Sequence, residues 1–545
     1  MRVALAQINP VVGDLDFNTK KIIDATRDCV KRGVSLLVTP ELGLTGYPPE
    51  DLMLREEFLV EVEHKLETLA TVVGKEAPNL TIVIGHPCFK AQENLLYNSA
   101  SVFKGCKFIG RYSKLELPNY AVFDERRYFA SDGGPLVFKC DQISFGVNIC
   151  EDIWFPRAPS LTKAAGADVL IVLNASPFQT NKDNERKQKV RKHVSALNLP
   201  VLFCNIVGGQ DELVFDGSSF ALDRNGDISA YAPEFEESLL IVDLDEFGNP
   251  KKNNSFPKKT QSTEQIFDAL VLGTRDYGLK NDYEKALVGL SGGIDSAVTL
   301  GIAAHAFGRD SVKAVFMRTK YTSAASIIDA KECAKSVGVN FVEEDIDIYV
   351  DLFKTRLSKE VTSEVVGLTE ENIQSRIRGL ILMAISNNEQ RLLLTTGNKS
   401  ELAVGYCTLY GDMCGGFAVL KDVYKTQVYN LATYLNSVLD GAIPQNIIEK
   451  CPSAELRHDQ KDEDTLPDYK TLDGILYRII DKNETFEQIV GNGFERRLVE
   501  DVFKLMRKAE FKRRQAPPGV KVSEHAFGRD WRYPISNKFV FYKGL

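Results

Sequence analysis

The sequence predicts an α/β protein of two domains, and three observations support this fold class. Short apolar segments rich in Val, Ile and Leu alternate with amphipathic helical patterns along most of the chain, as expected for sheets covered by helices. The chain has 545 residues, whereas a single hydrophobic core rarely extends beyond about 250–300 residues. The alternation breaks once, across the polar residues 246–262, which we interpret as a linker between domains 1–245 and 263–545.

The first domain begins with an apolar strand at residues 3–8, followed by an amphipathic helix at residues 18–32. Such short runs of Val, Ile and Leu fit the interior of a sheet that is covered on both faces. We expect further strands at residues 35–38, 81–85, 144–149, 169–173 and 201–205.

The second domain opens with a helix at residues 263–278, and we expect strands at residues 285–290, 312–317 and 392–396. A later segment, residues 451–469, is polar, acidic and proline-containing. Long irregular segments in compact domains are usually functional or disordered. We interpret this one as a mobile flap over a site.

Composition limits the class of function. The formal net charge of -8 argues against a general nucleic-acid binder, which needs a broad basic surface. The ten cysteines form no C-x-x-C pair and no H-E-x-x-H motif occurs, so a zinc site has no support. Neither a signal peptide nor a membrane-spanning run is recognisable. We therefore expect a cytoplasmic enzyme without membrane partners.

Three residue types that together make a nucleophilic site stand at the ends of expected strands. They are Glu41, Lys114 and Cys150. A thiol attacks a carbonyl as thiolate, so it needs a base such as Glu41 nearby. A lysine ammonium can stabilise the oxyanion that forms. Taken singly, each residue could equally be structural, since Glu and Lys are common and Cys is often buried.

The surroundings of these residues decide between the two interpretations. The contexts E-L-x-L-T-G-Y, Y-x-K-x-x-L-P and N-x-C-E-D-x-W occur in this order and together resemble the nitrilase superfamily of carbon–nitrogen hydrolases. The resemblance implies an αββα sandwich and a catalytic Glu41–Lys114–Cys150 triad. It also implies an assisting Glu125, and glutamine contacts from Tyr120, Glu151, Ser176 and Lys182.

A glycine-rich turn marks the second site. In ALVGLSGGIDSAV, a strand leads through Gly289, Gly292 and Gly293 into a helix. Backbone N–H groups in such a turn, with Ser291 and Ser296, can bind phosphate. Asp295 adds a carboxylate where a magnesium ion bound to phosphate would need one. The string S-G-G-x-D-S resembles the PP-loop of N-type ATP pyrophosphatases, which cleave ATP between its α and β phosphates.

Three later stretches narrow the family. ENIQSRIRG opens an amphipathic helix, for which we expect Ile373, Ile377, Leu380 and Ala384 on the core side, while Asn372 and Arg376 share another face. TTGNKSELAVGYCTLYGDMCGG carries Thr396, Asn398, Glu401 and Asp412, and AEFKRRQAPP carries Lys512. Together these stretches resemble the NAD synthetases, whose domain is a doubly wound parallel sheet.

The resemblance implies a role for each of these residues. ATP is bound by Gly289, Leu290, Ser291, Gly292, Gly293, Ile294, Asp295, Ser296 and Thr396; Mg²⁺ by Asp295 and Glu401; and deamido-NAD by Asn372, Glu401, Asp412 and Lys512. Lys421 and His525 are weaker candidates. Leu409 stands where related chains often carry lysine, so the nicotinate pocket differs in detail.

A nitrilase domain joined to this domain is the arrangement of the glutamine-dependent members of the family. We therefore expect ammonia from L-glutamine to amidate deamido-NAD through an adenylated nicotinate, giving NAD, AMP, pyrophosphate and glutamate. We also expect at least a homodimer through the second domain. The alternatives are another glutamine-dependent PP-loop amidotransferase with a different acceptor, a tRNA-modifying PP-loop enzyme, and a non-catalytic scaffold. The acidic charge and missing C-x-x-C disfavour the tRNA enzyme, and the intact site residues disfavour the scaffold.

Overall fold

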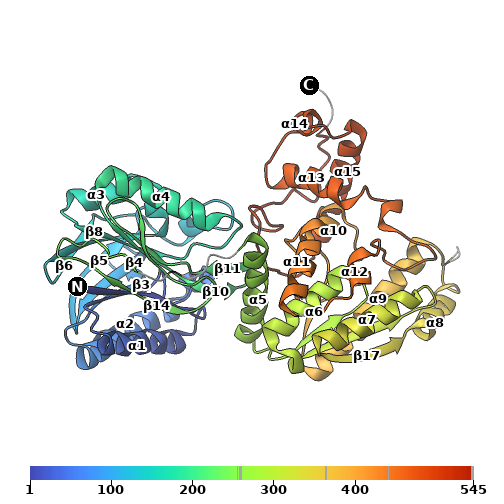
Figure 1. Cartoon of the computed structure of the whole chain (residues 1–545), viewed down its shortest axis with the longest axis horizontal. Helices are drawn as coiled ribbons and strands as arrows, with labels where there is room; N and C mark the ends of the chain where they lie inside the picture. Colours follow the sequence, from blue (N-terminus) through green and yellow to red (C-terminus); the bar gives the residue numbers. More distant parts are fainter. Residues whose placement is uncertain (254–255, 257–260, 362–364, 440, 542–545) are drawn as a thin grey trace. The chain divides into compact units, whose positions relative to one another are not determined.

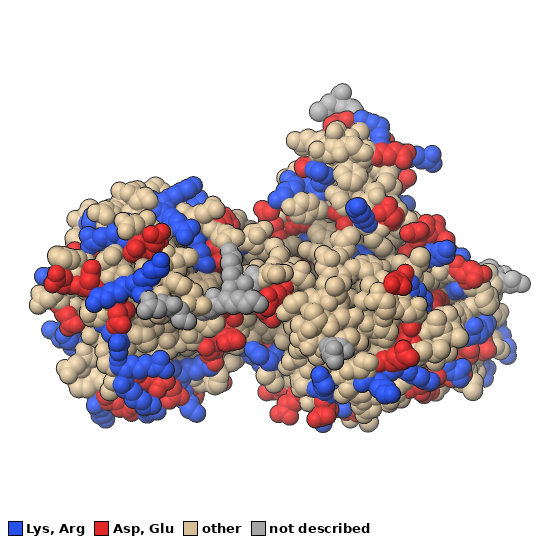
Figure 2. Space-filling model, in the orientation of Figure 1, with Lys and Arg blue, Asp and Glu red and all other residues tan. Residues whose placement is uncertain are grey.

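The computed structural model describes residues 1–253, 256, 261–361, 365–439 and 441–541. The chain divides into two compact units, Met1–Thr260 and Gln261–Leu545 (Figure 1). Among the described residues, no helix is long and apolar enough to cross a membrane. Acidic and basic side chains are interspersed over the face of each unit that is visible in Figure 2.

The first unit contains two six-stranded sheets. One has the order β14-β1-β2-β3-β4-β5, with β1 (Arg2–Gln7), β2 (Leu36–Val38), β3 (Thr81–Lys90), β4 (Leu95–Lys104), β5 (Lys107–Ser113) and β14 (Ser238–Asp243). The other has the order β13-β12-β9-β8-β7-β6, with β6 (Leu136–Cys140), β7 (Ile143–Ile149), β8 (Val169–Asn174), β9 (Val201–Asn205), β12 (Phe220–Leu222) and β13 (Ile228–Tyr231). A short hairpin joins β10 (Val207–Gln210) to β11 (Leu213–Asp216).

Helices cover the outer face of each sheet, so the unit has four layers (Figure 1). α1 (Leu15–Lys31) and α2 (Glu56–Glu76) pack on the first sheet, while α3 (Arg157–Ala164) and α4 (Lys182–Leu197) pack beside the second. Alternate residues of β1 serve two cores, because side chains of a strand point to opposite faces. Val3 and Leu5 face the other sheet, whereas Ala4 and Ala6 pack under the helices. The αββα sandwich expected from the sequence is confirmed.

The segment expected to be a linker, residues 246–262, begins as part of the first unit. Asp245 Oδ1 accepts hydrogen bonds from the N–H groups of Phe247 (2.9 Å) and Asn249 (2.8 Å), which closes a turn typical of aspartate. The chain then returns to the unit, where Lys251 N donates to Asp243 O at 2.8 Å and Asn253 N to Ser229 O at 2.7 Å. Residues 254–255 and 257–260 of the expected linker lie outside the described residues.

The second unit is built on a parallel sheet of order β17-β16-β15-β18-β19. The strands are β15 (Ala286–Gly289), β16 (Val312–Arg318), β17 (Asn340–Asp345), β18 (Leu392–Thr395) and β19 (Phe417–Ala418). α5 (Ser262–Lys280), α6 (Ile294–Phe307), α7 (Ala324–Val337) and α11 (Lys425–Val438) form one connected layer, while α8 (Asp347–Leu357) and α9 (Leu368–Glu389) form another. This is the doubly wound parallel sheet expected from the sequence.

A helical part completes the second unit (Figure 1). It contains α10 (Lys399–Val404), α12 (Gln445–Glu449), α13 (Tyr469–Ile480), α14 (Phe486–Gly491) and α15 (Arg496–Arg513). Leu472, Leu476, Val499 and Phe503 lie in the shared core of α10, α13, α14 and α15.

One expected helix face is wrong in part. Ile373 and Ile377 of α9 are buried as predicted, but Leu380 is 70% exposed and Ala384 is exposed as well. The inner face of the helix continues instead through Leu382, which packs with Leu287 and Leu393. The sequence analysis placed all four apolar residues on one buried face of the helix, whereas Leu380 lies on a different face that is exposed to solvent.

Strand order places the second site. β15 is flanked by β16 on one side and by β18 on the other, so the chain leaves β15 and β18 toward opposite halves of the sheet. In open α/β sheets, ligands bind at the carboxyl ends of the strands where the order reverses. The loops that follow β15 and β18 therefore meet where a nucleotide site is expected.

Candidate active sites

The first unit brings Glu41, Lys114 and Glu125 together in its interior. Lys114 Nζ donates to Glu41 Oε1 at 2.7 Å, to Glu125 Oε1 at 2.8 Å and to Glu125 Oε2 at 2.9 Å. All three side chains are buried. Burial disfavours the ammonium, but the two carboxylates outweigh it and raise the pKa of Lys114. An ammonium has three N–H donors, and each is used on a glutamate of the predicted site.

Cys150 comes from the opposite sheet, directly after β7. Its φ of 44° lies in the left-handed region of backbone conformation, which residues other than glycine rarely adopt. Burial and the charge of Glu41 raise the pKa of the thiol, so the resting side chain is neutral near pH 7. A neutral thiol requires a base before it can attack, and of the two carboxylates that act on it electrostatically, Glu41 and Glu151, Glu41 has the larger effect.

Glu41 is held from several sides. Its Oε1 also accepts from Asn98 Nδ2 at 2.8 Å, and its Oε2 accepts from Ala175 N at 3.0 Å. Tyr47 donates its hydroxyl to Glu125 Oε1 at 2.8 Å, while burial raises the pKa of Glu125. The carboxylates are therefore fixed in position before any substrate arrives.

Asp152 is a residue that the sequence reasoning missed. Its Oδ2 accepts from Ile149 N (2.9 Å) and from Tyr112 OH (2.8 Å), and its Oδ1 accepts from Leu115 N (3.1 Å) and Glu116 N (2.9 Å). The side chain thus ties the turn that carries Cys150 to the loop that follows Lys114. Only its place in the N-x-C-E-D-x-W string could have drawn attention to it.

The four residues expected to contact glutamine lie in the same unit. Tyr120 donates its hydroxyl to Glu151 Oε1 at 3.1 Å, and burial raises the pKa of Glu151 although the charges of Lys114 and Lys182 oppose this. Lys182 Nζ lies 4.4 Å from the centroid of the Trp154 ring. Ser176 is buried, and its N–H donates to Asn205 Oδ1 at 3.0 Å.

In the second unit, the expected residues line one cavity of about 460 Å³. The wall includes Gly289, Leu290, Ser291, Gly292, Gly293, Ile294, Asp295, Ser296, Thr396, Asn372, Glu401, Asp412 and Lys512. Gly292 has a φ of +79°, and a β-carbon there would lie 2.6 Å from the carbonyl oxygen of Ser326. Only glycine fits this turn, which leads into the first residues of α6.

The two residues expected to bind metal approach one lysine. Lys425 Nζ forms an ion pair with Asp295 Oδ2 and contacts Glu401 Oε1 at 3.2 Å. Asn398 Nδ2 donates to Asp295 Oδ1 at 2.8 Å. Burial and the charge of Asp295 raise the pKa of Glu401, although the charge of Lys425 opposes this. Lys425 also lines the cavity, and the sequence reasoning missed it.

The residues expected to contact deamido-NAD gather around the loop that follows α10. Thr408 donates its hydroxyl to Asn372 Oδ1 at 2.9 Å and its N–H to Asp412 Oδ1 at 2.6 Å. Lys512 Nζ donates to the carbonyl oxygens of Gly405 (2.7 Å) and Cys407 (2.6 Å). This loop therefore contacts Asn372, Asp412 and Lys512, three of the four expected residues, and the fourth, Glu401, lies on α10.

The weaker candidates lie elsewhere. Lys421 and His525 are not among the residues that line the cavity. The carbonyl of His525 accepts from Lys399 Nζ at 2.9 Å. Arg376 is also absent from the lining and donates from Nε to the carbonyl of Leu409 at 3.2 Å.

The segment interpreted as a flap lines the cavity with Cys451, Pro452, Ser453, Ala454, Glu455, Leu456, Gln460 and Asp462. Glu455 Oε1 accepts from Ser323 Oγ at 2.9 Å and from Lys450 Nζ at 2.9 Å. Gln374 Nε2 of α9 donates to Leu456 O at 3.0 Å. These contacts hold the segment against the starts of α7 and α9.

Both halves of the chain match known families. The carbon–nitrogen hydrolase family matches residues 2–248, and the NAD synthase family matches residues 266–516. The glutamine-dependent NAD(+) synthetase of Thermotoga maritima is 44% identical, with 99% of each chain covered. The enzyme of the same description from Acinetobacter baylyi is 43% identical, with 98% of each chain covered.

Solved structures agree with this match over the whole chain. The glutamine-dependent NAD+ synthetase of Acinetobacter baumannii in complex with adenosine diphosphate has a TM-score of 0.79 and 41% identity, covering 98% of each chain. A glutamine-dependent NAD(+) synthetase from Cytophaga hutchinsonii shares the fold with a TM-score of 0.84 at 20% identity, covering 98% of this chain and 97% of that one. The chain belongs to the family of glutamine-dependent NAD(+) synthetases.

Proposed function

We propose that the two sites perform the two halves of one reaction, with Cys150 releasing ammonia from glutamine and the cavity of the second unit using it. The chain is a ligase that amidates deamido-NAD to NAD with glutamine as nitrogen donor and ATP as substrate. The assignment to this acceptor, rather than to another, rests on the family match over the entire chain. The observation that carries the first half is the buried contact of Lys114 with Glu41 and Glu125 near Cys150.

In the first site, Glu41 takes the proton of the Cys150 thiol while Sγ bonds to the carbonyl carbon of the glutamine side chain. Glu41 then gives this proton to the leaving nitrogen, ammonia departs, and a thioester remains. Water hydrolyses the thioester and returns glutamate. Lys114 uses two of its donors on Glu125, so it can turn one toward the oxyanion and keep one on each glutamate. Tyr120, Glu151, Ser176 and Lys182 are proposed to hold the amino acid.

In the second site, the nicotinate carboxylate of deamido-NAD attacks the α-phosphorus of ATP and pyrophosphate leaves. Ammonia then bonds to the acyl carbon, AMP leaves with the C–O electron pair, and the nitrogen loses a proton. The turn from Ser291 to Ser296, with Thr396, is proposed to bind the phosphates through N–H and hydroxyl groups. Asn372, Glu401, Asp412 and Lys512 are proposed to bind deamido-NAD.

Asp295 and Glu401 fit a Mg²⁺ site. Their oxygens Oδ2 and Oε1 contact the same ammonium, so they can reach one cation. Among the described residues, no group of three or more His, Cys, Asp or Glu side chains could hold a metal. Two carboxylates suit magnesium, which takes its other ligands from phosphates and water. When bound, the ion would neutralise charge on the phosphates, while Lys425 would leave the carboxylates and turn to a phosphate oxygen.

We also propose that the chain pairs with a second copy through α9. Leu368 and Leu380 on this helix are 71% and 70% exposed, and Tyr410 is 66% exposed. A β-carbon on Gly379 would lie 2.8 Å from the carbonyl oxygen of Tyr410, so the backbone of Tyr410 lies against α9 next to Leu380. Large apolar side chains that are exposed on one part of a surface are typical of interfaces. The ATP and dinucleotide substrates of the proposed reaction also fit a cytoplasmic location for the protein.

One pair of variants tests the assignment of the two sites. NAD and AMP are measured with ATP, Mg²⁺ and deamido-NAD, supplied either with glutamine or with ammonium chloride. Cys150→Ala should abolish NAD formation from glutamine and leave formation from ammonium. Asp295→Ala should stop NAD formation from both sources and retain glutamine hydrolysis. If Cys150→Ala loses both activities, the role of Cys150 is wrong; if the wild-type chain makes no NAD from either source, the function is wrong.

A further inference from the structure

The short helix α10 carries Glu401 of the cation site and is preceded by Asn398, which contacts Asp295; two other residues lie between Asn398 and Glu401 in the sequence. Asn398 and Glu401 contact Asp295 and Lys425 at the cavity. Lys399 and Ser400 are completely buried and contact other elements. A helix of this length is not stable in isolation, because isolated helices need about 12–15 residues to be even marginally stable. Its position is therefore set by contacts with other elements: Leu402, Ala403 and Val404 pack in the core shared with α13, α14 and α15, and Lys399 and Ser400 fix its first turn.

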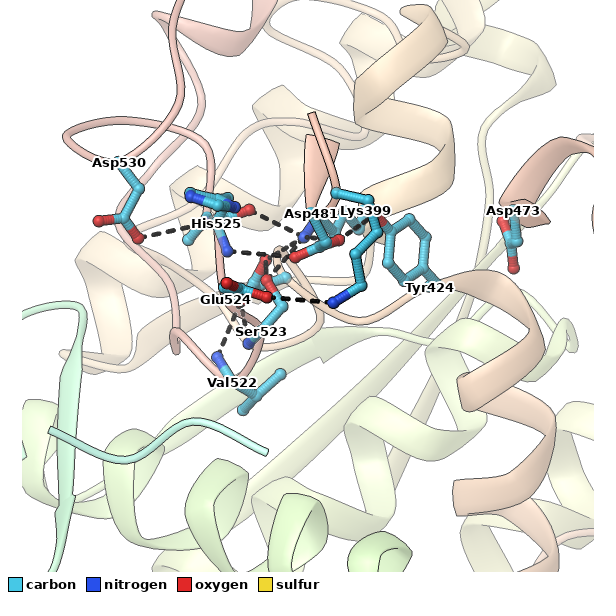
Figure 3. Close-up of polar contacts among 12 residues, drawn as sticks. Lys399, Tyr424, Asp473, Asp481, Val522, Ser523, Glu524, His525 and Asp530 are labelled. Atoms are coloured by element: carbon cyan, nitrogen blue, oxygen red, sulfur yellow. Dashed lines mark hydrogen bonds and ion pairs between the residues drawn. The ribbon is translucent and has the colours of Figure 1, made fainter. Parts of the chain in front are cut away.

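Lys399 is the centre of a buried polar cluster (Figure 3). Its Nζ lies 2.9 Å from Asp422 Oδ1 and 3.4 Å from Asp481 Oδ2. It also donates to Ser523 Oγ at 2.7 Å and to the carbonyl of His525 at 2.9 Å. A buried ammonium needs a partner for each donor, and this one has all its partners on other elements.

Two of the four partners of Lys399, Ser523 and His525, belong to the C-terminal segment 522–525, which also contacts the other two. Asp422 Oδ2 accepts from the N–H groups of Val522 (2.8 Å) and Ser523 (2.7 Å). Asp481 Oδ1 accepts from His525 N at 3.1 Å. The backbone N–H groups of segment 522–525 thus donate to the carboxylates of Asp422 and Asp481, and the segment encloses the Lys399 ammonium on this side (Figure 3).

The same cluster reaches the second side of the cation site. Tyr424 donates its hydroxyl to Asp481 Oδ2 at 2.6 Å, and the next residue is Lys425. Ser400 Oγ accepts from Lys425 N at 2.9 Å and donates to Asp473 Oδ1 at 2.5 Å. The cluster therefore fixes the start of α11 relative to the start of α10. The first carries Lys425 and the second carries Glu401.

We infer that Lys399 is a positioning residue that, with the C-terminal segment 522–525, sets the distance between Glu401 and Lys425 for binding of Mg²⁺ and ATP. This inference rests on the proposed role of Asp295 and Glu401. Lys399 itself does not line the cavity, so it acts through α10 and not through contact with the nucleotide. Of the residues proposed to bind deamido-NAD, only Glu401 lies on α10, while Asn372, Asp412 and Lys512 lie on α9, on the loop after α10 and on α15, so binding of that substrate should be affected less.

The test uses Lys399→Met, Lys399→Arg and Ser523→Ala in the full chain, with Lys313→Met as matched control. Lys313 is also a lysine of the second unit that pairs with a glutamate, Glu389, and it does not line the cavity. Binding of Mn²⁺ to the protein with a non-hydrolysable ATP analogue is followed by electron paramagnetic resonance. Hydrogen exchange of the α10 amides is measured without ligands, and KM values are measured with ammonium as nitrogen source.

We expect Lys399→Met to weaken Mn²⁺ binding and to raise the KM for ATP about tenfold or more, with faster exchange in α10. The KM for deamido-NAD and glutamine hydrolysis should stay within about twofold of wild type. Ser523→Ala, which keeps the ion pairs, should shift the same quantities less, and Lys399→Arg should restore part of the loss.

Two outcomes overturn the inference. One is a fall in kcat alone for Lys399→Met and Ser523→Ala, with Mn²⁺ binding and the KM for ATP unchanged, as expected from fewer folded molecules. The other is an equal shift in Lys313→Met. If Lys399→Met does not fold, Ser523→Ala and Lys399→Arg decide the question. A failure of Asp295→Ala to change Mn²⁺ binding would instead contradict the proposed cation site itself.

Discussion

Each site of this chain places one lysine between two carboxylates, but the two lysines have different surroundings. Lys114 is enclosed in the first unit, with all three donors on Glu41 and Glu125 at 2.7–2.9 Å. Lys425 lies between Asp295 and Glu401 on the wall of a cavity of about 460 Å³. The first cluster is complete without ligand. In the second, the lysine stands where a cation and a phosphate are proposed to enter.

This difference follows from the chemistry that each site is proposed to perform. Amide hydrolysis needs a nucleophile, a base and an oxyanion partner in fixed positions, so a closed and preorganised cluster suits it. Adenylation needs room for two nucleotides and a charge balance that changes as a metal and phosphates bind. A lysine that can move from carboxylate to phosphate keeps the acidic pair neutralised before the nucleotide arrives.

The largest expected effect comes from breaking the closed cluster. Lys114→Met should lower glutamine hydrolysis by about 10³-fold or more, because it removes an oxyanion donor and leaves two buried carboxylates without a cation. NAD formation from ammonium should remain near wild type. Lys187→Met is the matched control, since Lys187 is another buried lysine of this unit and pairs with Asp183 at 2.7 Å. An equal loss of hydrolysis in both variants would show that Lys114 acts only on folding.

The open cluster should respond in a different parameter. Lys425→Met should raise the KM for ATP by about 10–100-fold in the ammonium-dependent reaction, because a contact proposed to reach phosphate is lost. Glutamine hydrolysis should not change. Initial rates over a range of ATP at saturating Mg²⁺ measure the effect. An unchanged KM for ATP would mean that Lys425 stays with the two carboxylates and does not contact the phosphates of ATP.

The stability of the first unit should depend on pH through the buried side chain of His86. Burial lowers the pKa of His86 to about 3, and its Nε2 and Nδ1 each lie 2.8 Å from a partner, Ser101 Oγ and Pro87 O. Between pH 6.5 and about 3 the unfolded chain binds a proton here and the folded chain does not, so stability falls as pH falls.

The size of this effect can be measured by replacing the ring. His86 should cost about 2 kcal/mol of unfolding free energy between pH 7 and pH 5. Denaturant unfolding at both pH values, compared with His86→Gln, should show a smaller pH-dependent loss in the variant. An equal loss in both proteins would mean that His86 is protonated in the folded state.

The smallest expected effect concerns substrate contact at the edge of the closed cluster. Tyr120 is 54% exposed and donates to Glu151 at 3.1 Å. Tyr120→Phe should raise the KM for glutamine about threefold to tenfold, the size expected for one hydrogen bond, with little change in kcat. A drop in kcat without a change in KM would move Tyr120 from binding to the chemical step.

The sequence was sufficient to identify candidate residues whose place in the fold depends on their neighbours along the chain. Glu41, Lys114 and Cys150 each follow a strand within a recognisable string, and the turn from Gly289 to Ser296 is one continuous segment. The αββα and doubly wound folds followed from the same strings. Local strings carry this information because strand ends and tight turns are determined over a few residues.

The sequence was insufficient where partners are distant in the chain. Asp152 acts on Leu115 and Glu116, and Lys425 acts on Asp295, across separations that no local pattern shows. Lys421, a weaker candidate from the same string, does not line the cavity, whereas Lys425 does. The exposed Leu380 was assigned to the core because periodicity alone does not say whether an apolar position packs against the sheet.

The left-handed backbone at Cys150 has an evolutionary consequence. A side chain at a φ of 44° costs about 1–3 kcal/mol that glycine would avoid. Cys150→Gly should therefore make the chain more stable than Cys150→Ala while both lack glutamine use. Selection for glutamine use is therefore the reason to keep a side chain in this backbone conformation, and packing of Cys150 in the core between the two sheets offsets part of the strain.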